Sequence, residues 1–289
     1  MPVTTPPVVV AVGPRGSDSA VEYAASEALA RGTGLHLVHA VDMVPTGAGS
    51  DVLAAAVRRA TALVAGQVPV TFSLAQAPAV PAVVSVAGDA ALVVVGRCPE
   101  SRRTHPYGRS VTGGVAARVE APVVSVPDGW EAPGGAPHVV AGVDDPEHGD
   151  VLATAVAAAQ ERHGRLTVLT AWWRPTGSTE GPLTQVDDSA WPERLRTDLD
   201  RALAHLAPDT GLPLELHIRN ARPGDALIEA SHGAQLLVLG RHDPLLPTGS
   251  HLGPVARTVL RGAACPILLA APRHAHQVRH HDEPAMRPV

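Results

Sequence analysis

A glycine and two hydroxyl residues follow an apolar run that covers residues 92–95. The segment LVVVGRCPESRRTHPYGRSVTGG (92–114) turns at Gly96 and reaches Ser110 and Thr112 at a point where a helix can begin. A glycine after a strand lets backbone N–H groups approach a phosphate, and the N-terminus of a following helix adds favourable partial charge. The pattern therefore predicts an anion site, with the alternative that Ser110 only caps the helix.

The chain carries the same pattern twice. Residues 8–41 align with 139–172 at an offset of 131 residues, and the segments AALVVVGR (90–97) and AQLLVLGR (234–241) align at an offset of 144. The difference is a 13-residue insertion in the second copy, and the loop-forming residues of 172–188 place it there. With 289 residues, the chain is long enough for two domains that each bury a core.

Short β-branched runs alternate with helical periodicity within each copy, which favours βα units around a parallel sheet. In the first copy the apolar spacing predicts a helix that begins within residues 17–19 and ends at Gly32 or Gly34. The matching helix of the second copy is expected to stop at Gly164. We expect about five strands and about four helices per copy.

The composition divides the chain into four segments. We expect a first domain at 1–127 and a second domain at 138–272, joined by a linker at 128–137 that is rich in Gly and Pro. Residues 273–289 have no apolar period and are predicted to form a disordered tail. Nothing in that tail fixes a coordination geometry, so we predict no metal site there despite His274, His276, His280 and His281.

The turns after the first and fourth strands of each copy are where a ligand is expected. In an open α/β sheet, ligands bind beyond the carboxyl ends of the strands, near the point where the strand order reverses. Gly13 and Gly96 hold these places in the first copy, and Asp144 and Gly240 hold them in the second. Asp144 has the alternative role of capping the helix that follows it.

Charge and composition exclude several classes of protein. All 23 basic residues are Arg, and with 28 acidic residues the formal charge is -5, so no electrostatic footprint for nucleic acid or an anionic membrane is expected. No apolar run approaches the roughly 18 residues of a membrane span, and the N-terminus lacks the basic region of a signal peptide. Cys98 and Cys265 are too few for a disulfide framework. A cytoplasmic protein is predicted.

The catalytic motifs that this kind of sheet often carries are incomplete. A Walker P-loop and a receiver domain each need a Lys, and the chain contains none. The chain also lacks G-x-S-x-G, and G-x-G-x-x-G is missing after the first strand of either copy. We therefore predict no dedicated enzyme, although slow ATP hydrolysis would leave no mark in the sequence.

Both copies resemble the universal stress protein family. The resemblance rests on the strand ends VVVGR and LVLGR, on LVHAV and VLTAW, on ARPGDALIEASHGAQLLVLGR (221–241), and on ARVEAPVVSVP and TVLRGAACPILLA. It covers nearly the whole chain and excludes the tail. It implies an α/β fold of two tandem nucleotide-binding-like, open parallel five-stranded sheets with helices on both faces, the adenine nucleotide alpha hydrolase-like fold.

ATP-binding members of that family carry G-x2-G-x9-G-(S/T) after strand 4, and the first copy keeps part of it. Gly96 matches the first glycine and Ser110 keeps the hydroxyl, with Thr112 two residues further on. Pro99 and Arg109 replace the other two glycines. Without those glycines, fewer backbone N–H groups can approach a phosphate. Positive charge for the phosphate could instead come from Arg97, Arg102, Arg103 and Arg109.

The second copy departs from the motif at other positions. Gly240 and Gly253 match the first and third glycines, but Asp243 replaces the second and Pro254 replaces the hydroxyl residue. Pro254 offers neither an N–H nor a hydroxyl, and the carboxylate of Asp243 would repel a triphosphate. An empty site or a neutral ligand is favoured there.

The residues expected to contact the nucleoside are also divided between the two copies. The resemblance implies an Asp after strand 1 that contacts the nucleoside, which is present as Asp144 and replaced by Gly13 in the first copy. It also implies an adenine-packing residue after strand 2, which is Val41 in the first copy and Trp172 in the second. ATP or another adenine nucleotide is therefore a candidate cofactor without being a certain one.

Two functions stay open at this point. One is a regulatory or binding protein of stress adaptation with degenerate nucleotide motifs, and the other is a stress regulator with one working adenine-nucleotide site. The resemblance implies that the last strands, PVVSVP and PILLAAP, pair across an interface, which would bury two sheet edges and make an intramolecular pseudo-dimer. A further homodimer and an unknown protein partner are also expected.

Overall fold

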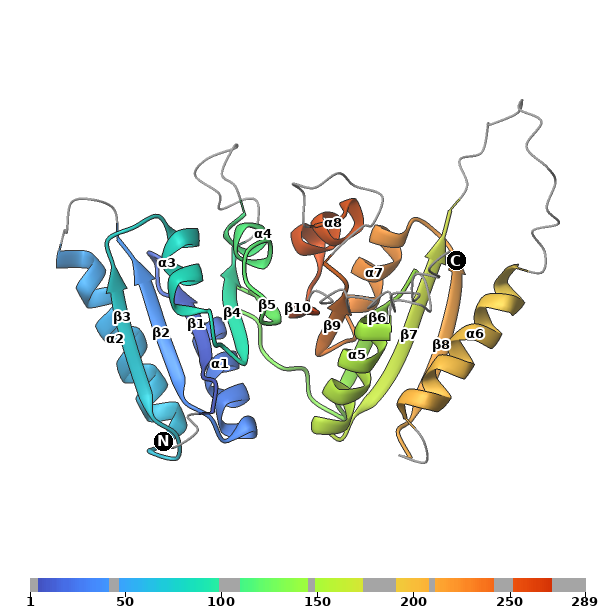
Figure 1. Cartoon of the computed structure of the whole chain (residues 1–289), viewed down its shortest axis with the longest axis horizontal. Coiled ribbons are helices and arrows are strands. Elements are labelled where there is room, and N and C mark those ends of the chain that lie inside the picture. Colours follow the sequence, from blue (N-terminus) through green and yellow to red (C-terminus); the bar gives the residue numbers. More distant parts are fainter. Residues whose placement is uncertain are drawn as a thin grey trace, which may run out of the picture.

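The fold consists of two halves that repeat one order of elements. The computed structural model describes residues 5–41, 47–98, 110–144, 149–173, 191–207, 211–241 and 252–271. Each half has five strands and four helices in the described residues, as the sequence predicts, and the halves follow one another along the chain (Figure 1). Predictions for the insertion at 174–188 and for the tail at 273–289 lie outside the described residues.

The first half begins with a buried strand and ends with a strand at the junction. Its strands are β1 (Val8–Val12), β2 (Leu35–Ala40), β3 (Val70–Ala75), β4 (Leu92–Arg97) and β5 (Val123–Pro127). Its helices are α1 (Asp18–Arg31), α2 (Gly47–Val64), α3 (Ala79–Val86) and α4 (Val111–Ala116).

The second half repeats this sequence of elements. Its strands are β6 (His138–Gly142), β7 (Arg165–Trp172), β8 (Leu214–Asn220), β9 (Leu236–Leu239) and β10 (Ile267–Leu269). Its helices are α5 (Gly149–Glu161), α6 (Trp191–Leu206), α7 (Pro223–Ser231) and α8 (Pro254–Gly262). The residues between the halves, 128–137, contain neither helix nor strand.

The strands form one ten-stranded sheet in the order β3-β2-β1-β4-β5-β10-β9-β6-β7-β8. Every pair inside a half is parallel, and the order reverses beside β1 and beside β6, which are the switch points where this fold binds ligands. The pairing predicted for the two last strands is present, because β5 and β10 are antiparallel with Val124 opposite Leu268. The two predicted sheets are thus continuous with each other.

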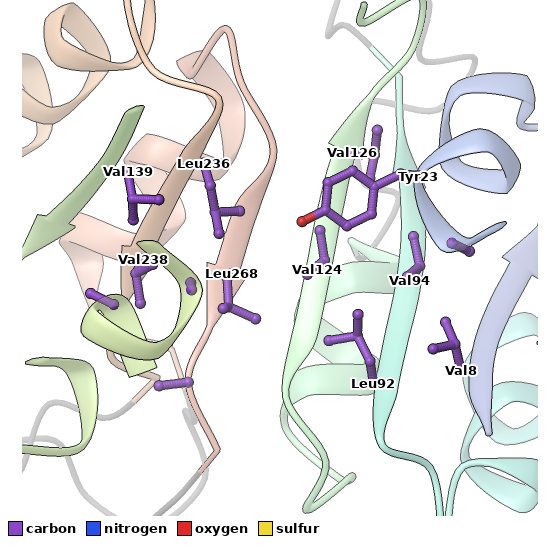
Figure 2. Packing of buried hydrophobic residues seen from close by; sticks show 14 of the residues in the cluster. Val8, Tyr23, Leu92, Val94, Val124, Val126, Val139, Leu236, Val238 and Leu268 are labelled. Carbon is purple, nitrogen blue, oxygen red and sulfur yellow. The ribbon is translucent and has the colours of Figure 1, made fainter. Parts of the chain in front are cut away.

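Helices cover both faces of the sheet with separate layers of apolar side chains. Side chains that point to one face pack with α1, α2, α5 and α6, and this layer runs from Val8 and Leu92 in the first half to Val139 and Leu236 in the second (Figure 2). The opposite face packs with α3, α4, α7 and α8. The strands are apolar on both faces because both are covered, which is why they appear as continuous apolar runs.

The ends of α1 follow from local signals. The helix starts after Ser17 and stops at Gly32, whose φ of 60° is the left-handed conformation that glycine adopts without steric cost. Both ends agree with the prediction. Across the helices of the described ranges, no segment is long and apolar enough to cross a membrane.

Candidate functional site

Each half has a cavity at the carboxyl ends of its strands. The first-half cavity has a volume of about 420 Å³ and lies where β1, β4 and β5 end. The second-half cavity measures about 290 Å³ and lies at the ends of β6, β7 and β9. Pockets for small ligands usually measure roughly 300–1,000 Å³, so the first cavity is large enough for a nucleotide-sized molecule and the second is marginal.

The first-half cavity brings together most of the residues predicted for it. Gly96, Ser110 and Thr112 all line it, together with Gly13 from the turn after β1. The Ser110 hydroxyl accepts a hydrogen bond from the N–H of Gly113 at 3.3 Å, so this residue does cap α4. The Thr112 hydroxyl lies 3.4 Å from the hydroxyl of Ser125 and is almost fully buried. Both hydroxyls therefore have partners within the protein.

Gly96 permits a close approach between the end of β4 and the start of α1. A Cβ atom at this position would lie 3.1 Å from Ser17 Oγ, closer than side chains normally tolerate. Ser17 Oγ in turn accepts the N–H of Gly13 at 3.1 Å, which folds the turn after β1 over the end of the strand. The glycine thus leaves space for the Ser17 side chain, and this role exists whether or not a phosphate binds.

Arg15 supplies a positive charge to the first cavity. Its exposed side chain lines the cavity, and Nη2 lies 3.4 Å from the thiol sulfur of Cys98. Asp128 also lines the wall. Sequence reasoning missed Arg15, although its place only two residues after Gly13 was a usable signal because that turn faces the predicted site.

Val41 does not reach this cavity. It is not among the described residues that line it, whereas the preceding residue, Ala40, is. The backbone N–H of Val41 donates to Ala75 at the end of β3, and its side chain lies against Gly49 of α2. The predicted adenine-packing position is therefore turned toward the helix on the other face.

The second-half cavity brings together Asp144, Gly240 and Gly253, as predicted. Its remaining wall is largely apolar and includes Leu169, Leu227 and Leu239 with Val151 and Val255. Pro254 is the first residue of α8 and also lines the cavity. A proline at this place removes one N–H from the helix start, so the donor set for a phosphate is reduced as the sequence suggested.

The arginines that follow Gly96 and Gly240 have partners that the sequence did not reveal. Arg97 Nη1 donates to the carbonyl of Leu260 at 2.9 Å, and Nη2 donates to the carbonyls of Ala263 and Cys265 at 2.8 and 3.2 Å. These acceptors lie at the end of α8, in the other half of the chain. The hypothesis that Arg97 balances a phosphate charge therefore competes with these bonds.

Arg241 makes the corresponding contacts in the opposite direction. Its guanidinium donates to the carbonyls of Ala116, Val119 and Ala121, at and beyond the end of α4. The residue is only 5% exposed, and burial lowers its pKa to about 10. A usable signal was present in the sequence, since an arginine follows the glycine in both VVVGR and LVLGR.

Several predicted positions lie outside the described residues. These are Pro99, Arg102, Arg103, Arg109, Asp243 and the four tail histidines. Within the described part of the chain, no group of three His, Cys, Asp or Glu side chains is arranged to hold a metal ion. Cys265 is buried and burial raises the pKa of its thiol to about 12.

Comparison with known proteins connects this architecture to one family. Residues 136–271 match the model of the Universal stress protein family. The chain is 29% identical to Universal stress protein Rv2005c of Mycobacterium tuberculosis, over 91% of this chain and 96% of that protein. It is also 29% identical to Universal stress protein Rv2623 of the same organism, over 71% of this chain and 70% of that one.

A solved structure shows the same fold over both halves. The universal stress protein from Archaeoglobus fulgidus DSM 4304 superposes with a TM-score of 0.63, covering 91% of this chain and 96% of that one at 14% identity. The family model matches the second half, and the relatives extend the match across the first. Residues 136–271 thus match the universal stress protein family, and the chain as a whole is similar to proteins of that family.

Proposed function

We propose that this chain is a ligand-binding regulatory protein of stress adaptation and that an adenine nucleotide binds in its first-half cavity. The observation that carries the proposal is the 420 Å³ cavity at the switch point of the first half, where Gly13, Gly96 and Ser110 meet the guanidinium of Arg15. We also propose that residues 1–127 and 138–272 are separate domains, with 128–137 as their linker, and that they form an intramolecular pseudo-dimer in the cytoplasm.

The first-half cavity offers an apolar wall and a polar end. Ala11, Val12, Ala40 and Val95 provide apolar surface for a base. Arg15 provides charge for a phosphate, and the hydroxyl hydrogen of Ser110 remains able to donate while its oxygen accepts from Gly113. Thr112 has a supporting role, since its hydroxyl faces Ser125 in the core.

Binding rather than catalysis is the function that this arrangement favours. Acid and base catalysis need a titratable group placed close to the reacting atom. The charged side chains lining the first cavity in the described ranges are Arg15, Arg97 and Asp128. Two of these are guanidinium groups, which do not exchange protons near neutral pH.

A nucleotide-independent interaction protein is the second candidate. The specific observation in its favour is that groups which could hold a phosphate already have partners: Thr112 with Ser125, and Arg97 with three carbonyls of the other half. In this alternative, the cavities are remnants of the fold and the protein acts through its surface.

Calorimetric titration with ATP, AMP and adenosine separates the two candidates. Nucleotide binding predicts saturable heat with AMP and a weaker response to adenosine, because Arg15 recognises the phosphate. Arg15→Gln should weaken AMP binding by about tenfold, the usual effect of losing a hydrogen bond to a charged group. Gly96→Asp should abolish it by placing a carboxylate beside Ser17.

The matched controls lie outside the first cavity. Arg58 is an exposed arginine of α2 that does not line the cavity, so Arg58→Gln should bind AMP as the unmodified chain does. Asp144→Ala tests the second cavity and should leave AMP binding in the first one unchanged. Absence of heat with millimolar ATP and AMP would reject the nucleotide proposal and favour the interaction protein.

A further inference from the structure

The two arginines at the ends of β4 and β9 cross the junction in opposite directions. Arg97 belongs to the first half and donates to carbonyls at the end of α8, whereas Arg241 belongs to the second half and donates to carbonyls at the end of α4. The last carbonyl oxygens of a helix accept no hydrogen bond from a backbone N–H of the same helix. They also carry the negative end of the helix dipole. A guanidinium is therefore a fitting partner for them.

The contacts of the two arginines are equivalent residue by residue. Arg241 follows Arg97 at the repeat offset of 144 residues, and the acceptors follow at the same offset: Leu260 after Ala116, Ala263 after Val119, and Cys265 after Ala121. Two independent surface contacts would not be expected to match in this way. The paired contacts are therefore a feature of the repeated unit and of the way its two copies join.

Each arginine also lines the cavity of its own half. Arg97 lines the first-half cavity, and Arg241 lines the second-half cavity. The helix that each one holds has its start at the other cavity, because Val111 of α4 lines the first and Pro254 of α8 lines the second. Each arginine thus links the cavity of its own half, through the last helix of the opposite half, to the opposite cavity.

The starts of the two helices also lie next to each other. A Cβ atom on Gly113 would lie 3.4 Å from Cδ1 of Leu252, which precedes α8 and is buried. Figure 1 shows α4 and α8 side by side at the junction, above β5 and β10. The segments that begin α4 and α8, next to the two cavities, therefore approach each other directly as well as through the arginines.

We propose that Arg97 and Arg241 form a crossed pair of helix clamps that couples the two cavities, so that filling one changes the affinity of the other. This inference rests on the proposed function, because it needs at least one cavity to bind a ligand. Coupling of this kind is reciprocal and commonly changes affinity by about 5- to 150-fold. The elements that would carry the change are the last helices, α4 and α8, whose ends are held by side chains of the other half.

Hydrogen exchange followed by mass spectrometry tests the clamps without any ligand. Arg97→Met should accelerate amide exchange in 254–265 by about tenfold, as expected for lost hydrogen bonds to a charged group, and leave 111–121 unchanged. Arg241→Met should do the reverse. Exchange that increases only in the variant's own half, or equally in both segments, would overturn the proposal.

Two further variants test whether faster exchange results only from a general loss of stability. Arg162→Met breaks another contact between the halves, from the residue that follows α5 to Tyr23 and Glu27 of α1, and should change neither segment. Arg97→Lys keeps a charge but offers a less suitable donor geometry, so it should give an intermediate effect in 254–265 if Arg97→Met does not fold. An equal response to Arg162→Met would count against the clamps.

Hydrogen exchange in the presence of AMP distinguishes failure of the coupling from failure of the proposed function. AMP added to the unmodified chain should change exchange in 254–265, and this change should disappear in Arg97→Met at an AMP concentration that calorimetry shows to saturate that variant. It should also disappear in Arg15→Gln, where AMP binding itself is weakened. If AMP does not bind the unmodified chain, the proposed function fails although the crossed exchange pattern stands. If AMP binds but 254–265 responds equally in Arg97→Met, the coupling fails.

Discussion

The indole of Trp130 packs edge-on against the ring of Tyr23, with 6.0 Å between ring centroids and 62° between the ring planes. Trp130 lies in the segment 128–137 that joins the two halves, and Tyr23 is a buried residue of α1. The Tyr23 hydroxyl accepts a hydrogen bond from Arg162 of the second half at 3.1 Å, and burial raises its pKa. The connection between the halves is therefore fastened to the first half by an aromatic contact.

Removing this aromatic contact should weaken the whole fold. We expect Trp130→Ala to lower the free energy of unfolding by about 1–2 kcal/mol, since an aromatic pair of this geometry contributes about 0.5–1.5 kcal/mol beyond the area it buries. Urea titration followed by circular dichroism measures the change. Trp173→Ala is the control, because Trp173 is 46% exposed and contacts only the guanidinium of Arg222 among the ring interactions of the described residues. Equal losses in the two variants would contradict this account.

The sequence predicted a linker at 128–137, where the structure has neither helix nor strand, but it did not predict that contact. Glycine and proline content is a local property, and it indicates that a segment lacks regular structure. The partner of Trp130 lies on α1, far away in the chain, so only the folded arrangement of the two halves reveals it. The same limit explains why composition indicated only a linker here.

Gly32 and His163 occupy equivalent places at the ends of α1 and α5, and both adopt left-handed backbone conformations. Their φ angles are 60° and 49°, and they are separated by the offset of 131 residues that relates the first parts of the repeat. Only the glycine adopts this conformation without steric cost. We expect His163→Gly to raise the free energy of unfolding by about 1 kcal/mol and Gly32→Ala to lower it by about 1 kcal/mol. Thermal unfolding of both variants checks the pair, and a loss of stability in His163→Gly would refute the conformational argument.

Gly164 is needed for a different reason from the one that its position in the sequence suggests. The sequence predicts it as the stop signal of α5, but α5 ends at Glu161 and the left-handed residue is His163. A Cβ atom on Gly164 would overlap the carbonyl oxygen of Pro137 and lie 2.8 Å from Pro137 Cβ. The glycine is needed because the start of β6 passes so close.

Substitution at Gly164 should therefore be costly. We expect Gly164→Ala to lower the free energy of unfolding by about 2 kcal/mol, because relief of the overlap requires movement of backbone. Gly134→Ala is a matched control within 128–137, since a Cβ there would meet nothing within 4 Å and should change stability little. Chemical denaturation of the two variants measures the difference. A Gly164→Ala protein as stable as the control would show that the close approach is easily relieved.

The candidate site was predictable where it depends on position along a strand, and unpredictable where it depends on side-chain partners. Apolar runs and turn residues indicated where β1, β4, β6 and β9 end, and the cavities lie at those ends. The acceptor of Arg97 on α8 is 163 residues away, so the sequence could only associate that arginine with a nearby phosphate loop. Val41 was misplaced because its side chain faces α2, which depends on the packing of that helix.

Two half-buried histidines should make the protein sensitive to mild acid. His138 lies at the start of β6, with Nε2 2.9 Å from the Thr167 hydroxyl and Nδ1 3.1 Å from the Gly233 carbonyl oxygen. His36 of β2 lies between the hydroxyls of Thr71 and Ser73, at 2.8 and 3.0 Å. Burial lowers the pKa of both histidines, because it disfavours the charged imidazolium.

The sign of the pH dependence follows from that direction. In the unfolded chain these histidines titrate near a pKa of about 6.5, whereas in the folded chain they resist protonation to a lower pH. The unfolded state therefore binds more protons as the pH falls below about 6.5, and the free energy of unfolding decreases in that range.

His138→Gln should reduce the loss of stability between about pH 7 and about pH 5, and His36→Gln should reduce it further. His205→Gln, at an exposed position of α6, is the control and should leave the slope unchanged. Urea titrations across this range measure the slope, and an unchanged slope in the double variant would mean that other groups govern the response to acid.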